Sequence, residues 1–78
     1  MMSAQVEEIY NKIDQLLVAR DMDNKAKIAT LMSDVIGMLN KLRNDDIGQT
    51  MRIMSHIQFV DKELHDEINR HSTHRIHK

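Results

Sequence analysis

The chain has 78 residues, with no cysteine and no proline, and 11 basic residues against 12 acidic ones give it a formal charge of −1. This length allows one small domain, which buries only about 60% of its unfolded surface. The lack of cysteine excludes disulfides and thiolate metal sites, and the near-neutral charge argues against a general attraction to nucleic acid. No apolar run approaches the roughly 20 residues of a membrane span, and no leader peptide is recognisable after Met1, so we expect a cytoplasmic location.

Apolar residues recur every three or four positions in three segments, a spacing typical of amphipathic α-helices. The first segment predicts a helix over about residues 3–19, with Ser3 as its N-cap. The second predicts a helix over about residues 24–43, and the third a helix over about residues 46–70. A basic, histidine-rich tail follows over residues 71–78. The expected fold is therefore all-α, a small helical hairpin or three-helix bundle in which residues 1–78 form a single domain.

The apolar arcs of the second and third predicted helices are too wide for one neighbouring helix to cover. At 100° per residue the first helix has an apolar arc of about 120°, the second about 160° and the third about 180°. The apolar line of the third helix also moves sideways after Met54, which indicates a change of packing partner along one continuous helix. We therefore expect the chain to assemble as a homo-oligomer.

The second half of the third predicted helix carries the candidate protein interface. Phe59 lies on the charged side of this helix, where an exposed aromatic ring is either incidental or an anchor for a partner. The interface candidates are Ile53, Ile57, Phe59, Val60, Leu64 and Ile68. The seven methionines fill a core or provide an adaptable binding surface, because their flexible side chains repack around different partners.

Two polar groups on the same helix are weak candidates for chemistry. Gln58, Asp61 and His65 share one face, but no nucleophile or glycine-rich loop accompanies them, so we interpret them as a polar seam beside the interface. The histidines of the tail, His71, His74 and His77, are spaced by three residues. His71 and His77 are six residues apart and point in different directions on a helix, so this segment alone cannot complete a tetrahedral metal site. The sequence thus predicts no catalytic residue, no metal site and no cofactor.

A small basic cluster near the junction of the first two helices defines an alternative, ligand-binding site. Its members are Tyr10, Arg20, Lys25 and Lys27. The basic side chains could receive a phosphate or another small anion at the start of the second helix, which would make the protein an oligomeric binder of small molecules or nucleotides. A small nucleic-acid-binding regulator is the third alternative, although the chain lacks stacking aromatic residues for this role.

The leading hypothesis follows from the amphipathic faces, because they are the strongest pattern in the chain. Faces of this kind bind other helices rather than substrates. We therefore predict a non-enzymatic helical module that binds itself and another protein, and that acts as a small regulator, inhibitor or adaptor.

Overall fold

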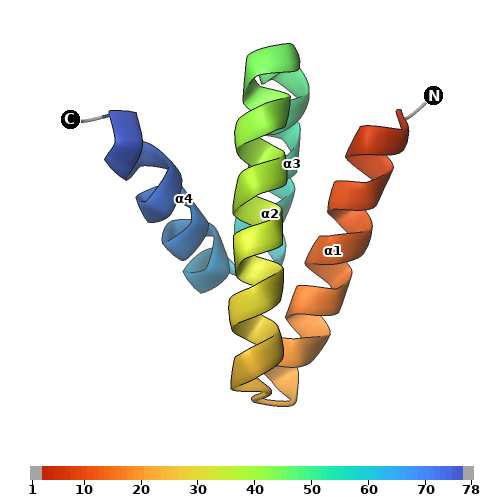
Figure 1. Cartoon of the computed structure of the whole chain (residues 1–78), viewed down its shortest axis with the longest axis vertical. Helices are drawn as coiled ribbons and strands as arrows, with labels where there is room; N and C mark the ends of the chain where they lie inside the picture. Colours follow the sequence, from red (N-terminus) through yellow and green to blue (C-terminus); the bar gives the residue numbers. More distant parts are fainter. Residues whose placement is uncertain (1–2, 77–78) are drawn as a thin grey trace.

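The computed structural model describes residues 3–76, and the side chains of residues 3–71. This part of the chain forms four α-helices: α1 (Ala4–Asp21), α2 (Lys25–Asp45), α3 (Ile47–Val60) and α4 (Lys62–Ile76). Successive helices run in opposite directions, and α1 and α4 lean away from α2 on opposite sides (Figure 1). The predicted all-α class is confirmed, since no strand occurs among the described residues. None of these helices combines the length and the apolar character that a membrane span requires.

Each helix begins where a polar side chain accepts a hydrogen bond from a backbone N–H three residues later. The capping pairs are Ser3 with Val6 at 3.2 Å, Asn24 with Lys27 at 3.3 Å, Asp46 with Gln49 at 3.2 Å, and Asp61 with Leu64 at 3.1 Å. Such caps satisfy N–H groups that have no partner inside the helix, and removing one costs about 1 kcal/mol. The helix boundaries therefore follow from local chemistry at these four residues.

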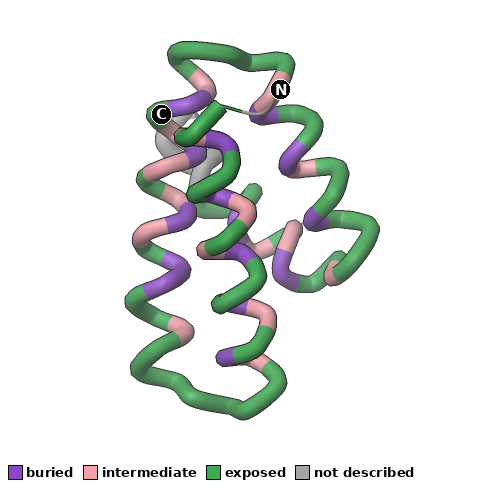
Figure 2. The backbone as a smooth tube through the Cα atoms, turned by 90° about the vertical axis from the view of Figure 1, so that its right-hand side faces the viewer, coloured by how far each residue is buried: buried purple, intermediate pink, exposed green. Residues whose placement is uncertain are grey.

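One hydrophobic core joins the four helices. Helix α2 lies at its centre and packs against α1, α3 and α4. Buried positions recur at helical spacing along the helices (Figure 2). The buried apolar side chains are Val6, Ile9, Ile13, Leu16, Ala19, Leu31, Met32, Val35, Leu39, Leu42, Ile53, Ile57, Leu64 and Ile68. The three apolar stripes predicted from the sequence thus supply a core within a single chain.

The third predicted helix, residues 46–70, is wrong as one continuous element, because the structure divides it at Asp61. This residue has extended backbone angles (φ −158°, ψ 91°) and forms the whole connection between α3 and α4. The break lets Ile57 of α3 and Leu64 of α4 enter the same core, where both are fully buried. The sideways shift of the apolar line occurs within α3, before this break, and separates the exposed residues Ile47 and Met51 from the core residues that begin with Ile53.

The predicted tail, residues 71–78, also differs from the structure. Helix α4 continues to Ile76, so residues 71–76 are helical rather than a separate tail. The side chains of His74 and His77, and residues 77–78 as a whole, lie outside the described residues. The helix extends further than the apolar pattern because no proline or glycine stops it after Ile68.

Candidate functional site

Most of the predicted interface residues belong to the core of the single chain. Ile53, Ile57, Leu64 and Ile68 have no exposed surface, so they are not available to a partner in this conformation. The structure places these four side chains in the core of their own chain, where the sequence analysis expected a surface for a partner. Phe59 is 90% exposed on the outer side of α3, and Val60 beside it is also exposed.

An apolar groove lies between α3 and α4. The groove has a volume of about 550 Å³ and is lined by Arg43, Ile47, Thr50, Met51, Met54, Ser55, Gln58, His65 and Asn69. Helix α3 supplies one wall, with residues spaced by three and four, and α4 supplies the other with His65 and Asn69. Ile47 and Met51 are 54% and 64% exposed, which is unusual for two neighbouring large apolar side chains.

The polar seam predicted from the sequence is divided between two places. Gln58 and His65 line the groove, whereas Asp61 lies in the helix break and binds the N–H of Leu64. Ile47 and Met51 were absent from the predicted interface. A signal for them existed in the sequence, because their line along the helix diverges from that of the core residue Ile57.

One ionic cluster stands on the α4 side of the groove. Lys62 Nζ donates a hydrogen bond to Asp66 Oδ2 at 2.9 Å, and His65 Nδ1 lies 3.0 Å from Asp66 Oδ1. The hydrogen bond from Lys62, followed by that from His65, holds the pKa of the Asp66 carboxyl below its ordinary value. A carboxylate with a lowered pKa contributes stability above its unfolded-state pKa and loses it as the pH falls through the folded-state pKa.

We expect the pKa of Asp66 in the folded protein to lie below that of an ordinary aspartate, and Lys62→Gln to raise it. The substitution removes the ammonium group whose hydrogen bond is the largest cause of the lowered pKa of Asp66. Titration of the Asp66 carboxyl carbon followed by NMR measures both values. A midpoint at or above the ordinary value in the unmodified protein would show that this cluster does not form in solution.

The predicted ligand-binding residues contact different parts of the molecule. Arg20 Nε donates to Asp61 Oδ2 at 3.2 Å, and its other nitrogens lie 3.4 Å from Glu63 Oε1 and 3.9 Å from Glu67 Oε1. Arg20 therefore faces three carboxylates of the α3–α4 connection and α4, and its charge is already compensated. Its position joins the end of α1 to the start of α4.

The other three predicted ligand-binding residues are separated from Arg20 by their contacts. The Tyr10 ring packs edge-on against His56 of α3, with centroids 5.3 Å apart. Lys25 is highly exposed and its Nζ lies 3.9 Å from Asp23 Oδ2. Tyr10, Arg20 and Lys25 thus do not form the anion site that the sequence suggested.

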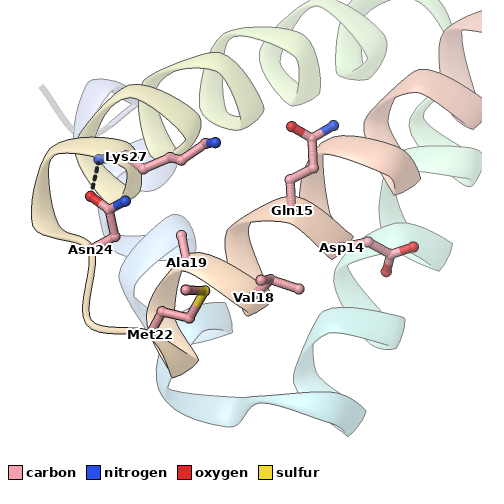
Figure 3. Close-up of a pocket in the computed structure, with 7 residues that line it drawn as sticks. All are labelled: Asp14, Gln15, Val18, Ala19, Met22, Asn24 and Lys27. Carbon is pink, nitrogen blue, oxygen red and sulfur yellow. Dashed lines mark hydrogen bonds between the residues drawn. The ribbon is translucent and has the colours of Figure 1, made fainter.

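Lys27 lines a pocket of about 380 Å³ at the α1–α2 turn (Figure 3). Asp14, Gln15, Val18, Ala19, Met22 and Asn24 complete its lining. Lys27 is the only cationic side chain of this lining, which also contains the Asp14 carboxylate, and the Asn24 side chain is engaged in capping α2. This pocket therefore offers no concentration of positive charge for a phosphate.

Within the described residues, no group of three or more His, Asp or Glu side chains is placed to hold a metal ion.

Comparison with known proteins finds no matching family model, no significantly similar curated protein and no significantly similar solved structure. The geometry of the groove and of the helix break is therefore the basis for the function proposed below.

Proposed function

We propose that this chain is a non-enzymatic protein-interaction module, a small regulator, inhibitor or adaptor that binds an amphipathic helix of another protein in the α3–α4 groove. The observation that supports this function is the pair of exposed side chains Ile47 and Met51 along the wall of a groove. Exposed apolar surface of this kind is costly in water and gains free energy when a partner covers it.

The length and composition of the groove suit a helix. Ile47 and Gln58 are eleven residues apart on α3, a rise of about 16 Å, which corresponds to about three turns of a partner helix. Helix-in-groove recognition uses apolar anchors on successive turns, and this length accommodates three or four of them. Met51 and Met54 add flexible side chains that adjust to the shape of the anchors.

The charge of the groove defines the partner further. Among the described residues that line it, Arg43 carries a full positive charge and no carboxylate is present. An amphipathic helix with an acidic residue at the Arg43 end of its apolar face would therefore be favoured, and one with a basic residue there would be disfavoured. The partner of this proposal is an apolar helix face with a carboxylate at one end.

We expect Met51→Glu to reduce the capture of the partner at least about tenfold, because a carboxylate would be forced into the apolar centre of the interface. The matched control is Met22→Glu, which places the same charge on a similarly exposed methionine of the α1–α2 turn, 71% exposed against 64% for Met51. Quantitative mass spectrometry of proteins captured by the unmodified chain and by each variant measures the difference.

A charge exchange tests the orientation of the partner helix. Arg43→Glu should weaken binding of the captured partner, and replacing the partner's acidic residue by lysine should restore binding to that variant. Partners captured equally by the unmodified chain and by Met51→Glu would show that the α3–α4 groove is not the binding surface.

A further inference from the structure

The connection between α3 and α4 is a single residue whose conformation depends on side-chain contacts. Asp61 Oδ1 accepts a hydrogen bond from the N–H of Leu64 at 3.1 Å, and Asp61 Oδ2 accepts one from Arg20 Nε at 3.2 Å. Residues 49–76 contain no glycine and no proline. Nothing in the covalent chain therefore prevents an α-helix from running through position 61, and the two contacts of Asp61 hold the break.

The apolar residues on both sides of the break would form one stripe if the helix were continuous. At 100° per residue they fall within an arc of about 80°, a normal width for one buried face. The members of this stripe are Ile53, Ile57, Val60, Leu64 and Ile68. A continuous helix over α3 and α4 would thus be amphipathic, and its second half would have to cover a core other than its own.

We propose that α3 and α4 can join into one helix through Asp61 and that two copies of this chain then exchange their α4 helices. In the exchanged dimer, Leu64 and Ile68 of each copy enter the core beside α2 of the other copy. These contacts are the ones that each chain makes with itself as a monomer, so the exchange costs little core packing. A twofold axis close to residue 61 places both α4 helices at once.

The energetic balance depends on the cap rather than on the core. Straightening one chain loses the Asp61 cap and its contact with Arg20, and gains the backbone hydrogen bonds of a continuous helix. The exchanged dimer also rebuilds the α3–α4 groove with α4 from the second copy, so this inference does not depend on the partner-binding function. A connection of one residue favours exchange, because short hinges under constraint are relieved when the chain extends.

The decisive variant is Asp61→Ala. It removes the cap of α4, and alanine is a better helix former than aspartate. The loss of one cap shifts the equilibrium from the monomer toward the exchanged form about fivefold. Two chains each lose a cap, so the dimer dissociation constant should fall roughly 25-fold relative to the unmodified chain. Sedimentation equilibrium over micromolar to millimolar concentrations measures this constant, after each sample is refolded from denaturant so that exchange is complete. Asp61→Asn is the matched control for the cap, because asparagine caps nearly as well as aspartate; its shift should be smaller than that of Asp61→Ala and reports the loss of the Arg20 ion pair alone.

A second substitution at the hinge should reverse the effect. Lys62 is the first residue of α4, where proline is tolerated, and Asp61 before it has an extended rather than a helical backbone, as the residue before a proline prefers. In a continuous helix, proline at position 62 would remove a hydrogen bond and clash with the preceding turn. The double variant Asp61→Ala/Lys62→Pro should therefore return to a monomer of 9.1 kDa.

A distance measurement distinguishes exchange from other kinds of dimer. The chain has no cysteine, so spin labels can be attached at Arg52→Cys on α3 and Arg70→Cys on α4, both exposed positions. Along a continuous helix these sites are eighteen residues, or about 27 Å, apart. In the monomer α4 folds back from the end of α3 and brings them closer (Figure 1). Labelled chains diluted with unlabelled chains report the distance within one chain.

The expected result is a distance near that of the continuous helix in the Asp61→Ala dimer and a shorter one in the Asp61→Ala/Lys62→Pro monomer. The proposal is overturned if Asp61→Ala dimerises no more tightly than the unmodified chain. It is equally overturned if the Asp61→Ala dimer keeps the short distance of the monomer, because the copies would then associate without exchanging α4.

Discussion

Ile57→Ala is expected to lower the free energy of unfolding by about 2–5 kcal/mol, because it removes three methylene-sized groups from a fully buried side chain and leaves a cavity. A core of this size supplies only about 3–5 kcal/mol of net stability. The variant should therefore be partly unfolded at room temperature. Urea denaturation followed by circular dichroism measures the change against the unmodified chain.

The matched control for this prediction is Ile47→Ala. It removes the same atoms from the same helix, but the Ile47 side chain is more than half exposed, so the expected loss is within about 0.5 kcal/mol. Equal unfolding free energies for the two variants would contradict the placement of Ile57 in the core. They would return this residue to the exposed interface that the sequence pattern suggested.

Arg20→Met should lower the free energy of unfolding by about 1–2 kcal/mol, more than a typical surface ion pair and less than a fully buried one. Arg20 and Asp61 are only 24% and 25% exposed, and the methionine keeps the apolar part of the side chain while removing the guanidinium. The Asp61 carboxylate would then keep the N–H of Leu64 but lose its cation. Urea denaturation at low protein concentration, which disfavours any dimer, measures the effect.

Salt and a second cation provide the controls for Arg20. The stability difference between the unmodified chain and Arg20→Met should become smaller as the salt concentration rises, because salt screens the interaction with the carboxylates. Lys25→Met should change stability by less than about 0.5 kcal/mol, since the Lys25–Asp23 pair is long and highly exposed. Variants of Arg20 and Lys25 with equal stability would show that the Arg20–Asp61 contact does not hold the helix break.

The first two helices could be predicted from the sequence to within two residues. The expected ranges of about 3–19 and 24–43 compare with Ala4–Asp21 and Lys25–Asp45. Both depend on local features: apolar residues at helical spacing and a polar side chain that caps the first turn, such as Ser3. Such features act within a few residues of the chain, so the sequence displays them directly.

The break at Asp61 could not be predicted in the same way. Aspartate is a good N-cap, but it also occurs within helices, and neither glycine nor proline marks this position. The contact that selects the cap comes from Arg20, which is 41 residues away in the sequence. The interface candidates Leu64 and Ile68 were misplaced for this reason, since the direction of α4 decides whether they meet α2 or a partner.

The sequence by itself determined an all-α chain with three amphipathic stripes, because side-chain spacing and helix caps are properties of neighbouring residues. Tertiary structure alone decided how these stripes meet: the turn at Asp61 makes one core from residues that could also serve two chains. The same turn opens the groove in which Ile47 and Met51 stay exposed. The physical reason is that the apolar pattern states which face of a helix must be buried, whereas only contacts between distant residues determine what buries it.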